Sequence, residues 1–289
     1  MNKKVKNGLV FISSLVSIAF AIMSIIAKKQ RDNDIYLNDP DEQNPLYKKR
    51  VIFIEDDNDP VNADGKKGHL EATGESDYRP NFYEKYVKRA IDVILSFGGL
   101  IVFSPIYAIT AIAIKIDDPG PVFFRQKRIA QGNGFFELIK FRSMSVNTPD
   151  NVPTHMLKNG GITKVGAFIR KHSIDEISQF WNIFRGDMSV IGPRPALWNQ
   201  DYLTAERDKY GANDVKPGLT GLAQISGRDE LEIEVKAKLD GEYAKKLHES
   251  SWSGFKTDAD VFIKSVFAVL GSDGVVEGGT GAMKKETAE

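Results

Sequence analysis

The sequence contains no cysteine among its 289 residues, which excludes a disulfide-stabilised fold, a thiolate nucleophile and a cysteine-ligated metal. It has no excess of either charge, because 39 basic side chains balance 39 acidic ones. A basic nucleic-acid-binding protein is therefore not expected. The chain is 42% hydrophobic, which is enough for a sizeable core, but its apolar residues are concentrated in two blocks.

The first block runs from Gly8 to Ala27 without a charged residue. At about 1.5 Å per residue, a helix of this length spans a hydrocarbon core about 30 Å thick. The run is longer than the apolar region of a signal peptide, and it ends without a typical cleavage site. Residues 1–29 are therefore predicted to be an N-terminal membrane anchor. Basic residues flank it on both sides, so the positive-inside rule favours neither orientation.

Both the segment after this anchor and the end of the chain have the composition of unstructured protein. Residues 30–84 are rich in Asp, Asn, Glu, Gly and Pro, and only residues 51–54 have the character of a strand. Such a segment buries too little apolar surface to order itself, so a flexible linker is predicted. Residues 276–289 are predicted to be a disordered tail.

The second apolar block covers residues 93–114, with Ser104 and Pro105 near its middle. Proline lacks an amide donor and clashes with the preceding turn, so a helix is expected to kink there, with the Ser104 hydroxyl bonding a freed carbonyl. Basic residues at both ends favour placing both ends on the cytoplasmic face. Residues 85–118 are therefore predicted to form a re-entrant helix. A kinked spanning helix is the alternative that these residues leave open.

The part that follows has the alternating pattern of a soluble α/β domain. Residues 121–128 and 135–142 are short aromatic and β-branched runs separated by a glycine-containing turn, which is typical of a β-hairpin. Alternation along the second run predicts that Lys140 and Arg142 share one strand face. Two cations on one face suit an anionic ligand, although a solvated strand face explains them equally well.

An acidic pair, Asp175 and Glu176, lies in a segment with the pattern of a helix start. Ser173 and Glu176 have the spacing of a capping box, apolar residues follow at helical spacing, and Gly186 is placed to end the helix. Helix capping alone accounts for such carboxylates. The same position also favours an ionised Asp175 close to a bound phosphate, so Asp175 is a candidate nucleophile and Glu176 a candidate Mg²⁺ ligand.

Three arginines lie in or near predicted loops and are candidate phosphate ligands: Arg170, Arg194 and Arg228. Pro193 and Pro195 flank Arg194 and restrict the backbone on both sides of it.

These residues together resemble the bacterial sugar transferase family, the monotopic phosphoglycosyl transferases that begin glycan assembly on a polyprenol phosphate. The resemblance covers about residues 85–270 and leaves the first 84 residues outside. The matching motifs are Lys88-Arg89-x-x-Asp92, Ser104-Pro105, Asp118-Pro-Gly-Pro-Val-Phe-Phe124, Lys140-Phe-Arg-Ser-Met144, Arg170 with Ser173-x-Asp-Glu176, Gly186-Asp-Met-Ser189, Gly192-Pro-Arg-Pro195, and Pro217-Gly-Leu-Thr-Gly221 through Ser226-Gly-Arg228.

The resemblance implies an α/β (α+β) fold, in which the re-entrant helix precedes a small catalytic domain over residues 119–275. It favours the re-entrant form over a spanning helix and places the catalytic domain at the cytoplasmic face of the bacterial inner membrane. The implied partners are a nucleotide-sugar donor, a polyprenol phosphate acceptor and the lipid bilayer, with no nucleic acid. A homo-oligomer is left open.

The implied reaction proceeds in two steps. Asp175 would attack the sugar-linked phosphate of the donor and release a nucleoside monophosphate, and polyprenol phosphate would then accept the sugar phosphate. Mg²⁺ held partly by Glu176 would screen the diphosphate. The implied phosphate ligands are Arg170, Arg194, Arg228, Lys140 and Arg142.

Two other classes of function are weighed against this one. A metal-dependent glycosyltransferase that moves only the sugar could use Asp258-Ala-Asp260 as a metal site, although the triplet equally suits the cap of a helix that begins there. A non-catalytic membrane assembly protein could use the charged motifs merely to hold loops together. It is disfavoured because so many cations near one predicted helix N-terminus are costly without an anion.

Overall fold

The computed structural model describes residues 3–148, 161–227 and 231–270, so the predicted tail at 276–289 lies outside the described residues. The chain divides into two units, residues 1–43 and 44–289. The first unit contains α1 (Lys3–Asp32) and the short α2 (Ile35–Asn38). Within α1, the stretch Ser13–Asp32 is long and apolar enough to cross a membrane.

The second unit begins with an antiparallel pair, β1 (Lys49–Glu55) and β2 (Gly68–Glu75). The flexible linker predicted for residues 30–84 is therefore wrong over these strands. These strands are ordered because they contact residues far along the chain. The backbone amide of Val51 donates to the Asp208 carboxylate at 2.9 Å, and Arg50 contacts Asp214 at 2.8 Å. Composition alone does not reveal such partners.

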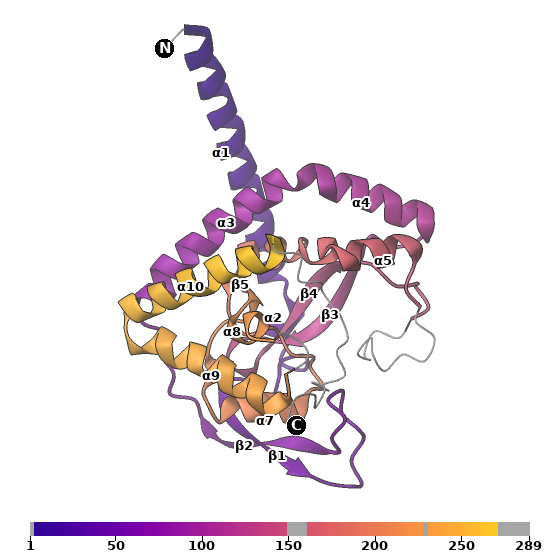
Figure 1. The fold of residues 1–289 in the computed structure, drawn as a ribbon, viewed down its shortest axis with the longest axis vertical. Coiled ribbons are helices and arrows are strands. Elements are labelled where there is room, and N and C mark those ends of the chain that lie inside the picture. The colour runs from indigo at the N-terminus through magenta and orange to yellow at the C-terminus, as the bar shows by residue number, and fades with distance from the viewer. Residues whose placement is uncertain (1–2, 149–160, 228–230, 271–289) are drawn as a thin grey trace, which may run out of the picture. The chain divides into compact units, whose positions relative to one another are not determined.

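A bent helix pair follows. The π-helical turn η1 (Tyr83–Lys88) leads into α3 (Arg89–Val102), and α4 (Ser104–Asp117) continues at 58° to the segment before it. Pro105 occupies the first turn of α4, and the Ser104 hydroxyl donates to the carbonyl of Ile101 at 2.7 Å. The predicted kink and its serine hydrogen bond are confirmed. Figure 1 shows the pair as an elbow along one side of the unit.

The rest of the unit mixes helices with small sheets, which confirms the α/β class in its coarse form. The predicted hairpin is confirmed as β3 (Phe123–Ile129) paired with β4 (Phe135–Phe141), joined by η2 (Gln131–Asn133). The short strands β5 (Ser189–Ile191) and β6 (Gly218–Thr220) pair in parallel. The helical elements are α5 (Lys164–Lys171), η4 (Ile174–Glu176), α6 (Gln179–Arg185), α7 (Asp201–Asp208), η5 (Ala212–Asp214), α8 (Leu222–Ile225), α9 (Ile233–Glu249) and α10 (Ser251–Leu270).

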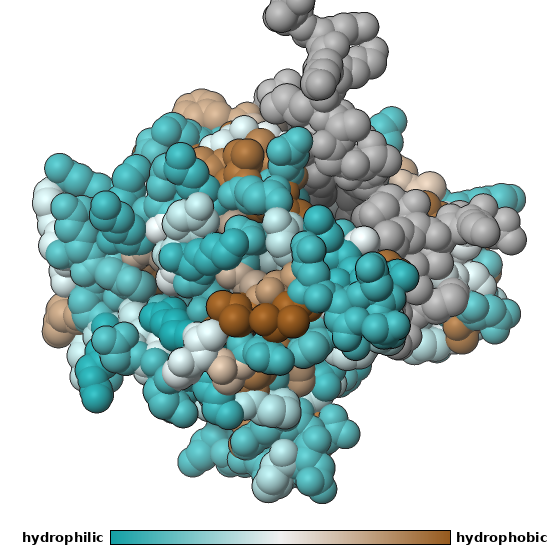
Figure 2. Space-filling view, turned by 90° about the horizontal axis from the view of Figure 1, so that it is seen from below, coloured by the Kyte–Doolittle hydropathy of each residue, from teal (hydrophilic) through white to brown (hydrophobic). Residues whose placement is uncertain are grey.

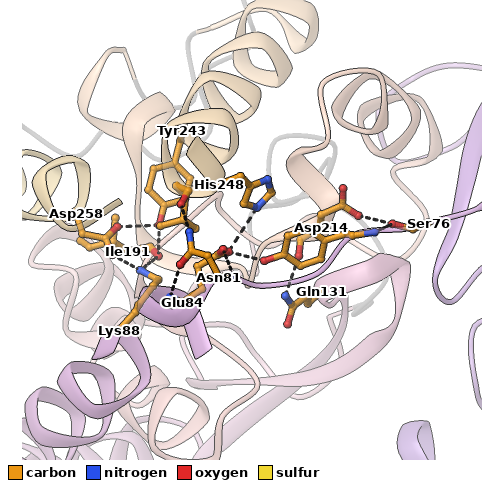
Figure 3. Close-up of polar contacts among 12 residues, drawn as sticks. Ser76, Asn81, Glu84, Lys88, Gln131, Ile191, Asp214, Tyr243, His248 and Asp258 are labelled. Carbon is orange, nitrogen blue, oxygen red and sulfur yellow. Dashed lines mark hydrogen bonds and ion pairs between the residues drawn. The ribbon is translucent and has the colours of Figure 1, made fainter. Parts of the chain in front are cut away.

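The main core packs α9 and α10 against β4 and β5, and a buried polar network crosses it. Lys88, at the end of η1, donates to the carboxylate of Asp258 at 2.7 Å and to the carbonyl of Ile191 at 2.9 Å. Tyr243 also donates to Asp258, at 2.8 Å, and Figure 3 shows these side chains converging from separate elements. A buried charge pair satisfied in this way fixes the start of the bent helix on the domain.

The two sides of this unit differ in polarity. Exposed apolar side chains project from the elbow, including Val102 and Ile109, and from α10, including Phe267. In Figure 1, α5 and α10 lie along the same side of the unit as the elbow. Figure 2, seen from the side of β1 and β2, shows a mostly hydrophilic surface with small hydrophobic patches, one of them near its centre. Large exposed apolar surfaces indicate contact with a membrane or a partner.

Candidate active site

The acidic pair lies on a tight turn and not at the start of a long helix. Ser173 has a left-handed backbone (φ 54°) and makes no capping hydrogen bond, Asp175 and Glu176 lie in η4, and α6 begins only at Gln179. The predicted capping box is therefore wrong, because the Glu176 carboxylate is held by cations from other segments (below). The predicted stop is confirmed, since Gly186 ends α6 at φ 102°.

Polar side chains hydrogen-bond this turn to the edge of β4 that does not pair with β3. The Ser178 hydroxyl donates to the carbonyl of Ile139 at 3.0 Å. The Asn182 side chain accepts from the amide of Ile139 at 3.0 Å and donates to the carbonyl of Glu137 at 2.8 Å. The two side chains thus satisfy backbone groups that a further strand would otherwise pair. The acidic turn is held directly beside Lys140.

Two carboxylates and two cations meet there. Lys140 Nζ lies 3.1 Å from Glu176 Oε1 and 3.8 Å from Asp175 Oδ2. Arg194 Nη2 lies 2.8 Å from the same Glu176 oxygen. Asp175 is almost fully buried, with 2% of its surface exposed. Such a cluster of opposite charges in a partly buried setting is a candidate for chemistry on an anionic substrate.

The cations decide the ionisation state of Glu176. Burial favours the neutral acid, but the guanidinium of Arg194 and the ammonium of Lys140 outweigh it and hold the pKa of Glu176 well below its usual range. Glu176 is therefore an anion at neutral pH, with both cations engaged on one of its oxygens.

The segment that carries Arg194 is held by close backbone packing. It follows β5, and the amide of Gly192 donates to the carbonyl of Thr220 at 2.8 Å. Gly218 donates to the carbonyl of Pro193 at 2.8 Å. A Cβ atom at Gly192 or Gly218 would collide with the backbone of the other segment, so both positions require glycine. The backbone around Arg194 is thus restricted by the packing of Gly192 and Gly218 as well as by the two flanking prolines.

One predicted phosphate ligand, Arg142, is paired with a residue outside this cluster. Arg142 follows the last residue of β4, where strand alternation no longer applies, and it contacts the Asp118 carboxylate at 3.2 Å and the Asp118 carbonyl. The prediction that Arg142 and Lys140 serve one anion is therefore not supported. Arg170 contacts Ser143 at 3.0 Å on the neighbouring segment. Arg228 lies outside the described residues.

The Asp258-Ala-Asp260 triplet does not form a metal site. It lies inside α10 and not at its start, so the predicted cap is wrong. Asp258 is buried against Lys88 and two tyrosines, whereas Asp260 is exposed and contacts Lys264 at 2.7 Å. Residues two apart on a helix point to different sides, so the two carboxylates cannot share an ion. Within the described ranges, no group of three or more His, Asp or Glu residues is arranged to hold a metal.

Sequence reasoning missed Ser178 and Asn182, which position the turn. A usable pattern was present, because Asp175, Ser178 and Asn182 follow one another at spacings of three and four residues. Polar side chains repeating at helical spacing inside an apolar segment indicate a buried polar contact.

Comparison with known proteins relates this geometry to a family. A model described as bacterial sugar transferase matches residues 83–272. The chain is 39% identical over 180 residues to a UDP-glucose:undecaprenyl-phosphate glucose-1-phosphate transferase of Escherichia coli (strain K12), covering 60% of this chain and 38% of that protein. It is 37% identical over 164 residues to a UDP-N-acetylgalactosamine-undecaprenyl-phosphate N-acetylgalactosaminephosphotransferase of Aeromonas hydrophila, covering 55% and 38%.

A shorter relative is matched over most of its length. The chain is 34% identical over 203 residues to the exopolysaccharide production protein ExoY of Rhizobium meliloti (strain 1021), covering 65% of this chain and 87% of that protein. By contrast, the chain spans only 38% and 54% of the two UDP-glucose:undecaprenyl-phosphate transferases from Escherichia coli and Caulobacter vibrioides.

Proposed function

This chain belongs to the bacterial sugar transferase family, and we propose on that basis that it moves a sugar 1-phosphate from a UDP-sugar to undecaprenyl phosphate. The step would release a nucleoside monophosphate and begin the assembly of a bacterial surface glycan. The observation that carries the proposal is the buried Asp175 beside an ionised Glu176, with Lys140 and Arg194 directed at the pair. The printed functions of the relatives in Escherichia coli and Aeromonas hydrophila support it.

In the proposed reaction, an oxygen of Asp175 attacks the phosphorus that bears the sugar. The bond from this phosphorus to the nucleoside monophosphate breaks, and an acyl phosphate forms on Asp175. An oxygen of undecaprenyl phosphate then attacks the same phosphorus and releases the Asp175 carboxylate. Lys140 and Arg194 offset the charge that develops on the phosphoryl oxygens. Arg170 and Arg228 are proposed as further phosphate ligands, while Arg142 is engaged by Asp118.

The residues at the cluster fit a Mg²⁺ ion. Magnesium is commonly held by one or two carboxylates together with water and substrate phosphates, and Glu176 supplies an ionised carboxylate at the acidic pair. We propose Glu176 as the protein ligand. When bound, Mg²⁺ would neutralise charge on the diphosphate of the donor.

The proposed function is tested by incubating the full-length protein in vesicles containing undecaprenyl phosphate with a panel of UDP-sugars. We expect release of the nucleoside monophosphate with one or a few of them. Release of the nucleoside diphosphate would instead support the sugar-only glycosyltransferase. If neither the nucleoside monophosphate nor the nucleoside diphosphate were released from any donor, the result would support the non-catalytic assembly protein.

We also propose that the elbow of α3 and α4 enters and leaves the bilayer on the cytoplasmic side of the bacterial inner membrane, with α1 as an additional anchor. The exposed apolar side chains of the elbow and of α10 support this placement. It would hold Asp175 at the level of the lipid headgroups, where undecaprenyl phosphate carries its phosphate. The nucleotide sugar would arrive from the cytoplasm.

Labelling of single cysteines tests this topology directly, since the natural sequence contains none. Lys85→Cys and Lys115→Cys introduce exposed thiols near the two ends of the elbow. In spheroplasts, a membrane-impermeant maleimide is expected to label neither position until the membrane is opened. Lys238→Cys on α9 serves as the cytoplasmic control. Labelling of one end from outside would show that the elbow spans the bilayer.

A further inference from the structure

Only part of α4 faces the catalytic domain. Tyr107, Thr110 and Ile114 are buried or half-buried at helical spacing, whereas Ile109 and Ile112 are exposed. Tyr107 lies one turn after the bend, and its amide donates to the carbonyl of Phe103 at 2.9 Å. The hydroxyl of Tyr107 donates to the main-chain carbonyl of Ile177 at 2.5 Å. This carbonyl belongs to the residue directly after Glu176.

The ring of Tyr107 makes a second contact with the site. It packs against the ring of Phe141 at a centroid distance of 5.3 Å, and Phe141 directly follows Lys140 on β4. Tyr107 and Ile177 pack against the same small apolar cluster, which contains Phe141. One side chain of the bent helix therefore touches both segments that carry the charged groups, the strand of Lys140 and the turn of Glu176.

We propose that Tyr107 is a positioning residue that couples the bent helix to the acidic pair. Its hydroxyl holds the Ile177 carbonyl and so fixes the orientation of Asp175 and Glu176 relative to Lys140. The inference rests on the proposed function. Displacing a reacting group by about 1 Å lowers a rate by about 10²-fold, so a remote hydrogen bond that orients the turn affects turnover strongly.

We expect the fold to tolerate loss of the hydroxyl. The Ile177 carbonyl also accepts from the amide of Phe180 at 3.2 Å, so loss of the tyrosine hydroxyl does not leave this carbonyl without a partner. Phenylalanine keeps the ring and its contact with Phe141. Tyr107→Phe thus removes the link to the turn and leaves the packing in place.

The experiment compares the full-length wild type with Tyr107→Phe in vesicles containing undecaprenyl phosphate and a UDP-sugar that the wild type uses. We expect Tyr107→Phe to lower kcat by about 10- to 100-fold. The KM for the donor should stay within about twofold, since the hydroxyl is engaged by the carbonyl of Ile177. Tyr86→Phe is the matched control, because Tyr86 is exposed and loses only a surface hydroxyl. It should leave kcat unchanged.

A wild-type kcat in Tyr107→Phe would overturn the inference, and so would a raised KM with kcat preserved. If Tyr107→Phe lowers the unfolding temperature, amide hydrogen exchange distinguishes a local effect on the acidic turn from a general loss of stability. Faster exchange confined to residues 174–178 would support the positioning role, whereas faster exchange across the chain would overturn it. A wild type that releases no nucleoside monophosphate from any donor refutes the proposed function itself, whatever the variant does.

Discussion

Replacing Asp175 with asparagine is expected to abolish transfer, lowering turnover by at least about 10⁴-fold, while the protein remains folded. The amide has almost the same shape as the carboxylate, so the buried position is still filled. It carries no negative charge and cannot form the acyl phosphate. The wild type incubated with the donor alone should gain the mass of a sugar phosphate on the peptide that contains Asp175, and Asp175→Asn should gain none.

Asp260→Asn is the matched control for this substitution. Asp260 is exposed on α10 and contacts a surface lysine, Lys264, at 2.7 Å, so the same carboxylate-to-amide change should leave turnover unchanged. The control also examines the alternative metal triplet, because loss of activity in Asp260→Asn would restore it. Retained turnover in Asp175→Asn, with an unfolding temperature like that of the wild type, would remove Asp175 from the mechanism.

The parts of the fold that depend on sequence neighbours were predictable. The hairpin of β3 and β4 follows from strand alternation interrupted by a glycine-containing turn. The bend at Pro105 follows from a missing amide, and the Ser104 hydrogen bond follows from the carbonyl that this frees. The end of α6 at Gly186 follows from a positive φ that glycine adopts without strain.

The environment of Glu176 was not predictable, because its partners are distant in the sequence. Lys140 precedes it by 36 residues and Arg194 follows it by 18. The local pattern favoured a capping box, whose hydrogen bond contributes about 1 kcal/mol. Charge-assisted hydrogen bonds contribute about 1.5–3 kcal/mol each, so the two cations outcompete the cap. A local pattern was overridden by contacts that form only in the folded domain.

The ordered hairpin of β1 and β2 illustrates the same limit. Its own composition predicts disorder, since it buries little beyond Val51. Arg50 and the amide of Val51 find their partners on Asp208 and Asp214, which lie more than 150 residues later. Composition reports what a segment can bury by itself and not what the rest of the chain supplies.

Replacing Glu176 with glutamine is expected to lower turnover by about 10²-fold or more and to remove its dependence on Mg²⁺. Glutamine cannot balance Lys140 and Arg194, and it is a poor ligand for Mg²⁺. The measurement is turnover against Mg²⁺ concentration, with EDTA as the metal-free reference. Glu137→Gln is the matched control, because Glu137 pairs with Arg125 at the surface, at 2.6 Å. This variant should leave the Mg²⁺ dependence of turnover unchanged. An unchanged Mg²⁺ requirement in Glu176→Gln would exclude Glu176 as the ligand.

The same variant has a stability consequence with a defined pH range. Because the folded state holds the pKa of Glu176 below its usual value, the ionised carboxylate stabilises the protein fully above about pH 4.3 and less as the pH falls further. At pH 7, Glu176→Gln should therefore be less stable than the wild type. We expect its free energy of unfolding to be lower by about 2 kcal/mol, a value that allows for the partial exposure of Arg194. The difference should narrow as the pH falls below about 4.3, because the carboxylate then takes up a proton in the unfolded wild type while it is still ionised in the folded protein. If the difference in the free energy of unfolding between the two proteins stayed constant below about pH 4.3, the two cations would not hold Glu176 ionised in the folded protein.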